Sequence, residues 1–232
     1  MEIPGVVPNK VHIDLFGGFD VPETMITCWA VMVLIIVFAL IVRFVLMKKF
    51  KEKPKGFQNV IELTVEAANN FTRSILHGKA TSLSGYIYTL GALLIFSGLV
   101  ELLGVRAPAT DLNFTIALAL CTFVLINAYG IRYKGVLGRV KSLGKPKPFI
   151  APIKIMSDVA VPISLACRMF GNLFSGLIIM DLIYSVLSGI AFGVAAVGIP
   201  AILSIYFNLF HVGMQAYVFI MLSLSFINEA VE

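Results

Sequence analysis

The sequence predicts an all-α integral membrane protein: one membrane domain over residues 1–232 with about five membrane helices, the last two long and strongly tilted. Hydrophobic residues make up 59% of the chain and mean hydropathy is +0.94, more than a soluble fold of this length would carry. Charged residues make up only 13%. Several apolar runs reach the roughly 20 residues that cross a hydrocarbon core of about 30 Å.

The N-terminal part combines a polar segment with the first span. Residues 1–21 are rich in turn-forming residues and have no basic leader before an apolar core, so we expect a retained external segment. The first span is expected at 25–47, with Trp29 near its start in the position of an interfacial aromatic belt. The strongly basic segment 48–55 follows. Because short basic loops stay in the cytoplasm, the N-terminus is expected outside.

Residues 56–77 are too polar to span a membrane, yet apolar and small residues recur in them at helical spacing. The repeating positions are Phe57, Val60, Ile61, Thr64, Ala68, Phe71 and Ile75. This pattern predicts an amphipathic helix on the cytoplasmic surface or against a partner subunit. A plain surface linker helix explains it equally well.

Residues 82–131 read as a membrane hairpin, with spans at Tyr86–Leu103 and Leu112–Ile131 joined by a short external loop. The segment 132–148 that follows contains six Lys or Arg residues and no acid. It is therefore expected in the cytoplasm. The two basic loops agree on the orientation of the chain.

The last third of the chain predicts two long helices, at 149–189 and 199–228. The first apolar region is about twice the length of a perpendicular span, so it must tilt steeply or break. Pro162 removes a backbone hydrogen bond and favours a kink there. A glycine-rich external turn at 188–198 leads into the final helix, and the C-terminus is expected in the cytoplasm.

Several classes of site are not expected. The three cysteines lie in apolar runs at no metal-binding spacing. Gly138 and Gly144 are one residue too far apart for a phosphate-binding loop, and Pro146 stands where Ser or Thr would bind magnesium. No interleaved basic and aromatic surface indicates nucleic acid. We therefore expect no metal, cofactor, nucleotide or nucleic-acid site.

A single arginine, Arg168, lies near the middle of the fourth apolar region. Helical steps of three and four residues from it trace one mostly polar face: Ser157, Val161, Ser164, Arg168, Asn172 and Ser175. A charge at that depth costs between roughly 3 and 17 kcal/mol, so intramembrane charges are functional by default. Arginine holds its proton too tightly to relay it, which makes Arg168 a fixed charge. The structural alternative is an arginine paired with helix carbonyls or with Asp158.

Three ordered stretches resemble subunit a of the F-type ATP synthase. PISLACRMFGNLFSG, Pro162 to Gly176, resembles the signature of that family; ATDLNFTIALAL, Ala109 to Leu120, resembles its third membrane segment; and QAYVFIMLSLSFI, Gln215 to Ile227, its closing helix. Together they cover most of the membrane part. The resemblance implies a chain with five membrane segments whose long helix pair wraps a rotor ring.

The resemblance also implies a function and partners. The chain would be the stationary ion-channel subunit of the membrane sector, beside a c-ring, peripheral-stalk b subunits and membrane lipid, in a bacterial plasma or inner membrane. ATP would be made elsewhere in the complex. Arg168 would separate two offset half-channels, with Asn172 and Ser175 on the same face, and Gln215 would hydrogen-bond its guanidinium. For Gln215 the alternative is a residue that only joins helices.

The sequence departs from its family at positions where members commonly carry ionisable residues: Leu177, Lys154 and Asn208. Other ionisable residues lie one helical turn away: Asp181, Asp158 and His211. We expect Asp181 and His211, with Asn208, to line the half-channel toward the outside, and Asp158 to mark the mouth of the cytoplasmic one. The alternatives are an interfacial or helix-pairing role for Asp181 and a packing role for His211.

The main alternative function is a self-contained cation channel or secondary transporter. It predicts internal repeats and an acid of its own at mid-membrane, and the sequence has no convincing repeat and no acid near the depth of Arg168. A purely structural anchor would carry the central arginine at a needless cost. Co-purification with a rotor subunit that carries a membrane carboxylate discriminates between these functions.

Overall fold

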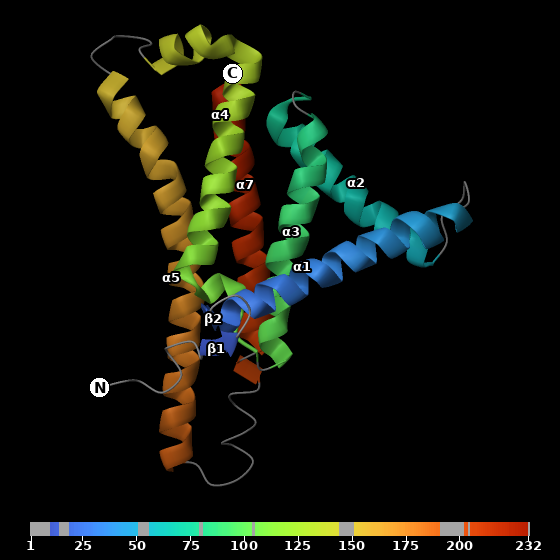
Figure 1. Ribbon diagram of the computed structural model, residues 1–232, viewed down its shortest axis with the longest axis vertical. Helices are drawn as coiled ribbons and strands as arrows, with labels where there is room; N and C mark the ends of the chain where they lie inside the picture. The colour runs from blue at the N-terminus through green and yellow to red at the C-terminus, as the bar shows by residue number, and fades with distance from the viewer. Residues whose placement is uncertain are drawn as a thin grey trace.

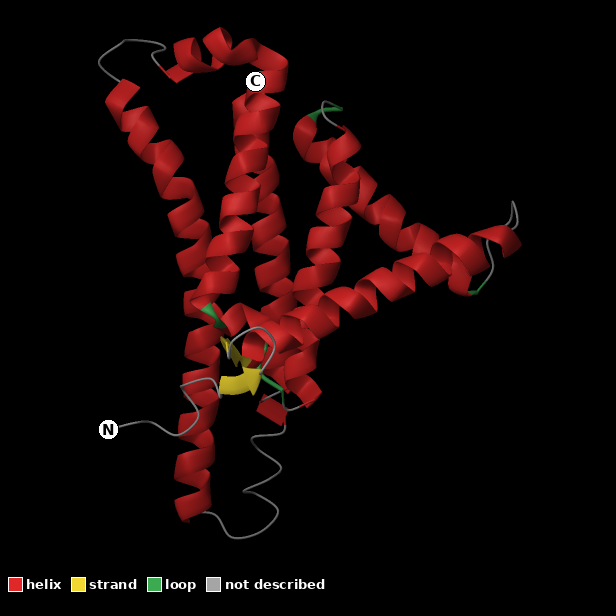
Figure 2. Ribbon diagram, viewed as in Figure 1, coloured by secondary structure: helices red, strands yellow, loops and turns green. Residues whose placement is uncertain are grey.

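The computed structural model describes residues 10–13, 19–50, 56–78, 81–103, 105–143, 151–190, 202–203 and 205–231. Helices dominate these residues (Figure 2). Four helical stretches are long and apolar enough to cross a membrane: Glu23–Leu46, Leu112–Gly138, Met156–Leu187 and Val212–Val231. The helical membrane class is therefore supported. The remaining predicted span corresponds to a shorter apolar helix, Ser84–Leu99.

The N-terminal segment contains a feature that the sequence did not predict. Strands β1 (Lys10–Ile13) and β2 (Phe19–Pro22) pair antiparallel, with Lys10 opposite Pro22. Two four-residue strands are too short to give a readable alternation of polar and apolar residues. Helix α1 (Glu23–Ile41) begins directly after β2 and continues through a π-helical turn at Val42–Leu46.

The middle of the chain forms two helices that meet at one end of the molecule. Helix α2 (Phe57–Leu76) lies within the range predicted for the amphipathic helix, and α3 (Ser84–Leu99) continues as a tighter turn at Val100–Leu103. The apolar face of α2 packs inward only toward the end of the helix, where Leu76 is buried and the ring of Phe71 lies 5.6 Å from that of Tyr217; Phe57 and Val60 near its beginning are exposed. The location of α2 at the cytoplasmic surface stays a prediction.

The last three helices differ in length from the predicted spans. Helix α4 (Leu112–Leu143) extends past the predicted end at Ile131 and changes direction at Gly135. Helix α5 (Ala151–Ile190) is continuous through Pro162, so a break is not needed there, and at about 1.5 Å per residue it spans about 60 Å. Helix α7 (Val212–Val231) follows a π-helical turn at Tyr206–His211. Most of the predicted external turn at 188–198 lies outside the described residues.

Helix α7 is the centre of the packing. It lies beside α4, with α5 along the outer side of α4 and α3 on the other side (Figure 1). One buried cluster joins α3, α4, α5 and α7 around Met169 and Phe219, and a second joins α2, α3, α4 and α7 around Leu224 and Ile227. Helix α1 leaves this bundle at a large angle (Figure 1).

The chain ends and turns agree only in part with the predicted alternation of membrane crossings. The connection from α2 to α3, the end of α4, the beginning of α5 and the C-terminus share one end of the molecule (Figure 1). The sequence assigns all four to the cytoplasmic side. The end of α1 and the beginning of α2 lie away from this end (Figure 1), although the sequence assigns their connection to the same side. The alternation and the orientation in the membrane therefore stay predictions.

Candidate ion-translocation site

Helix α5 has two faces of different character near its middle. Its inner face is buried in the first cluster through Leu165, Ala166, Met169 and Leu173. Arg168, Asn172 and Ser175 are exposed on its outer face, together with Ser157 and Ser164. The predicted polar stripe is therefore a surface feature of this chain, as an interface with another subunit requires.

Arg168 is solvent-accessible and has no ion pair within the part of the chain that the structure describes. Asp158 lies ten residues earlier on the same helix, about 15 Å along the axis, so it cannot neutralise the guanidinium. The structural alternative of an Arg168–Asp158 pair is therefore excluded. The guanidinium remains available to a carboxylate that approaches from outside the chain.

A hydrogen bond connects α5 to α7 one turn beyond the arginine. The Asn172 side-chain amide Nδ2 donates to Oε1 of Gln215 over 2.7 Å. Gln215 is only 6% exposed, so the bond satisfies an acceptor that would otherwise be buried unpaired. The resemblance implied that Gln215 binds the arginine; in this structure its oxygen accepts from Asn172 instead.

Ser175 takes no part in this cross-helix contact. Its hydroxyl donates to the backbone carbonyl of Gly171 on its own helix, over 2.6 Å. Serine hydroxyls commonly bond the carbonyl four residues earlier when no other partner is in reach. Ser175 therefore adds polarity to the exposed face without joining α5 to α7.

The antiparallel packing of α5 and α7 aligns two carboxylates on the same side of this bond, toward the end of the molecule that holds the C-terminus (Figure 1). Asp158 precedes Asn172 by fourteen residues, and Glu229 follows Gln215 by the same number. Both acids therefore lie about 21 Å from the bond along their helices. Because the helices run in opposite directions, this displacement is toward the same end of the molecule.

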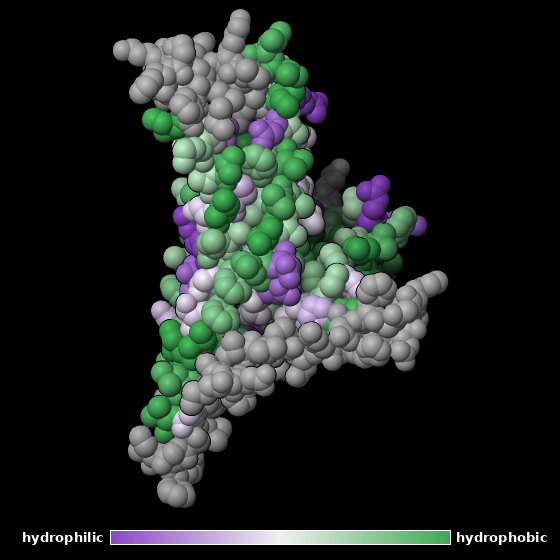
Figure 3. Space-filling view, turned by 60° about the vertical axis from the view of Figure 1, so that its left-hand side comes forward, coloured by the Kyte–Doolittle hydropathy of each residue, from purple (hydrophilic) through white to green (hydrophobic). Residues whose placement is uncertain are grey.

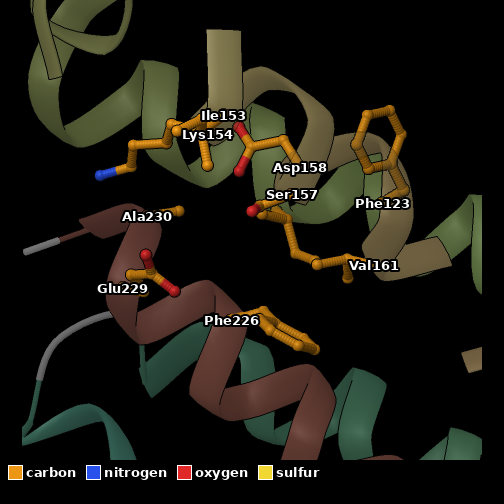
Figure 4. Close-up of a pocket in the computed structure, with 10 residues that line it drawn as sticks. Phe123, Ile153, Lys154, Ser157, Asp158, Val161, Phe226, Glu229 and Ala230 are labelled. Carbon is orange, nitrogen blue, oxygen red and sulfur yellow. The ribbon is translucent and has the colours of Figure 1, made fainter. Parts of the chain in front are cut away.

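Asp158 and Glu229 line one cavity of about 300 Å³ between α4, α5 and α7. Figure 4 shows the two carboxylates on opposite sides of it, with Ser157 beside Asp158. Lys154 lines the rim, and the apolar wall consists of Phe123, Ile126, Ile153, Val161, Phe226 and Ala230. A cavity of this size has room for several water molecules, which the two carboxylates and Ser157 could bind.

Sequence reasoning missed Glu229 as a site residue. The sequence alone does not indicate it, because the side of α7 that faces Asp158 depends on the register between two helices. The equal spacing from Asn172 and from Gln215 would have indicated it, had that hydrogen bond been known.

The residues predicted for the outer half-channel are not brought together by any described contact. Asp181 is exposed nine residues beyond Asn172, and His211 lies four residues before Gln215, so their heights differ by roughly 8 Å along the bundle. Nε2 of His211 is buried and has no hydrogen-bond partner among the described residues. The side chain of Asn208 lies outside the described residues.

The remaining surface of this region is largely apolar. Figure 3 brings the α5 side forward and shows scattered polar residues in a mostly hydrophobic face, as expected for a surface in contact with lipid or with another membrane subunit. Within the described residues no group of three or more His, Cys, Asp or Glu side chains is arranged to hold a metal ion.

Comparisons with known proteins identify relatives over most of the chain. The family model for the ATP synthase A chain matches residues 25–228. The chain is 30% identical over 230 residues to the sodium ion specific ATP synthase subunit a of Propionigenium modestum, covering 92% of this chain and 75% of the relative. It is 29% identical to the ATP synthase subunit a of Oceanobacillus iheyensis, covering 97% of each chain.

Proposed function

The chain belongs to the ATP synthase A chain family, and on this premise we propose that it is the stationary ion-channel subunit of a rotary ATP synthase. One observation carries the proposal: Arg168 lies exposed at the middle of a roughly 60 Å helix, unpaired among the described residues. An intramembrane cation without a partner in its own chain calls for an anionic partner from another. A rotor ring whose subunits carry a membrane carboxylate supplies one.

The mechanism follows from the charge of Arg168. A rotor carboxylate crosses lipid only when a proton or bound sodium ion neutralises it. Near the guanidinium the ionised form is favoured, so the ion is released. The carboxylate then passes Arg168 and is loaded again from the other side. The guanidinium also repels cations and so blocks a direct leak between the two half-channels.

The cytoplasmic half-channel of this proposal begins at the cavity between α4, α5 and α7. Its carboxylates, Asp158 and Glu229, attract cations, and Ser157 adds a hydrogen-bonding wall. Members of the family commonly carry an acid where this chain has Lys154. Glu229 restores a negative charge on the facing helix, so the cavity keeps an excess of acid over base.

The outer half-channel is proposed to run past Asp181, with His211 and Asn208 on the facing segment. The buried, unpartnered Nε2 of His211 supports a polar path here, since such an atom calls for a water molecule or another donor or acceptor. The preceding π-helical turn at Tyr206–His211 supports it further, because π-helical turns are frequent at functional sites.

The proposed partners and location follow from the same family assignment. The exposed face of α5 would lie against the c-ring, and peripheral-stalk b subunits would contact other helices. The relatives compared here come from bacteria, which supports a location in a bacterial plasma membrane.

The arginine provides the direct test. We expect Arg168→Ala in the assembled complex to abolish both ion-driven ATP synthesis and ATP-driven ion pumping in inverted vesicles. Arg168→Lys keeps the charge but loses the planar, permanently ionised group, and is expected to retain at most a small residual rate. Assembly is checked by co-purification of the c-ring. Normal coupled transport in an assembled Arg168→Ala complex would contradict the proposal.

A further inference from the structure

Helix α4 turns sharply at its cytoplasmic end. Gly135 has φ 72° and ψ 165°, values that interrupt the helix, and helical structure resumes up to Leu143. Figure 1 shows this last segment running across the end of α4 rather than continuing along it. The segment 136–143, named here the crossing segment, therefore lies at a steep angle to the membrane helices.

The turn is encoded by Gly135 itself. A Cβ atom added at this position would meet no atom within 4 Å, so the glycine is not required for close packing. What it supplies is the positive φ, which other L-residues adopt rarely. Replacing Gly135 with alanine would therefore favour a helix that continues straight.

The crossing segment begins with two apolar side chains that are exposed among the residues the structure describes. Val136 is 64% exposed, and Leu137, at 78%, is the most exposed of the large apolar residues described. In the sequence, apolar residues recur at helical spacing at Val136, Val140 and Leu143. This pattern predicts one apolar side to the segment, to which the exposed Val136 belongs.

The charge around this segment has one sign. Arg132 is exposed and Lys134 is partly exposed just before the turn, and residues 132–148 contain six Lys or Arg and no acid. The exposed ring of Tyr133 stacks on Tyr129 with centroids 6.5 Å apart. Basic residues, tyrosines and exposed aliphatic side chains at one end of a membrane helix are the composition of a lipid interface.

We propose that the crossing segment lies in the headgroup layer of the cytoplasmic leaflet and binds anionic phospholipid. Val136 and Leu137 insert toward the acyl chains, while Arg132 and Lys134 contact phosphate groups. The uniform positive charge favours an anionic lipid surface over a protein surface, which normally carries charges of both signs. The turn at Gly135 lets the segment lie flat instead of projecting into the cytoplasm.

Depth-dependent quenching of a fluorophore tests the location of the segment. A fluorophore is attached at Leu137→Cys after replacement of Cys28, Cys121 and Cys167 by alanine, and the assembled complex is reconstituted in vesicles of phosphatidylcholine and phosphatidylglycerol. In one sample only the phosphatidylcholine carries bromine on its acyl chains, and in the other only the phosphatidylglycerol does. The brominated lipid has the same mole fraction in both samples. We expect both brominated lipids to quench, with phosphatidylglycerol several-fold more effective. Dissolved iodide is expected to quench weakly.

Variants connect the result to the proposed contacts. Gly135→Ala is expected to lower lipid quenching and raise iodide quenching. Gly85→Ala is the matched control, because Gly85 has no positive φ and a Cβ there would meet no atom within 4 Å, and it is expected to leave quenching unchanged. Arg132→Gln with Lys134→Gln is expected to remove the preference for phosphatidylglycerol while both lipids still quench. Size-exclusion chromatography verifies assembly of each variant.

Three outcomes would overturn the proposal. Strong iodide quenching without lipid quenching would mean that the segment is in water. Protection from both quenchers would mean that a protein subunit covers it. Equal quenching by the two lipids would refute the binding of anionic lipid. None of these measurements depends on ion flow, so they stand apart from the test of Arg168.

Discussion

Asn172 and Gln215 form a polar side-chain bond between α5 and α7. Asn172→Ala would leave the buried oxygen of Gln215 without a donor, at a cost of about 1–3 kcal/mol. We expect the assembled complex to lose thermal stability, and ATP-driven pumping to fall because α5 and α7 are no longer held in register. Thermal unfolding of the purified complex and dye-monitored pumping measure the two effects.

Ser175→Ala is the matched control for Asn172→Ala. Ser175 lies one turn further along the same exposed face, but its hydroxyl bonds only the Gly171 carbonyl of its own helix. Its removal is expected to change stability by less than about 0.5 kcal/mol. Equal losses from the two variants would mean that the cross-helix bond has no special role.

Asp181 tests the outer half-channel. A proton relay needs an ionisable group, and Asp181→Asn keeps the size of the side chain while removing ionisation. We expect ion-driven ATP synthesis to fall by about tenfold or more. Asp181→Glu is expected to retain most of the rate. An unchanged rate in Asp181→Asn would restrict Asp181 to an interfacial or helix-pairing role.

Glu229 tests the cytoplasmic cavity. Glu229→Gln removes one of its two carboxylates and leaves Lys154 to balance Asp158, so cations are attracted less strongly. We expect slower ATP-driven pumping, with a further loss when Asp158→Asn is added. Glu66→Gln, on the exposed face of α2, changes the same charge outside the cavity and should leave pumping intact. Equal rates in Glu229→Gln and the unaltered complex would remove Glu229 from the pathway.

At the scale of elements, the packing of α3 on α7 depends on glycine. A Cβ at Gly98 would overlap the side chain of Val212, one at Gly91 would lie 3.1 Å from Cδ1 of Ile220, and one at Gly85 would meet nothing within 4 Å. We expect a graded series of alanine variants. Gly98→Ala should destabilise by about 1–3 kcal/mol, Gly91→Ala should have a small effect, and Gly85→Ala should be neutral or stabilising.

Thermal unfolding of the complex measures this series, and Val212→Ala provides the rescue. Adding Val212→Ala to Gly98→Ala makes room for the new methyl group, so the double variant should recover part of the loss. A Gly98→Ala variant as stable as Gly85→Ala would show that α3 can move away from α7 at no cost.

Some helices can be predicted from the sequence and others cannot. Helices over 25–41 and 57–76 are predictable, because a long apolar run and a helical repeat are local patterns. The continuation of α4 to Leu143 is not, because a single glycine looks the same in a loop and in a helix that turns. The path of α5 through Pro162 also depends on neighbouring segments rather than on the proline alone.

The candidate site also has parts that the sequence predicts and parts that it does not. The stripe through Arg168 follows from helical spacing and the structure exposes it, as an interface requires. The pairing of Asn172 with Gln215 and the location of Glu229 opposite Asp158 depend on the register between helices far apart in the sequence. No local pattern contains that register.

For the whole molecule, the proposed function requires a second subunit type. The chain has one fixed charge in the middle of α5 and supplies no moving carboxylate at that depth. We expect the purified chain alone to add no proton conductance to vesicles. The full complex, which contains both this chain and the rotor, is expected to acidify vesicles when ATP is added. Vesicles with the rotor alone are the control. Conductance by the isolated chain would favour a self-contained channel.

The support that α5 receives from its own chain is slight. Only 6% of the most apolar stretch of Met156–Leu187 is buried within the molecule, against 44% for Val212–Val231. A copy synthesised without neighbours would therefore present a long, poorly anchored helix to the proteolytic quality control of the membrane. The amount of this chain in the cell would then be set by its least abundant partner subunit. Equal amounts of the subunits would be reached without a dedicated regulator.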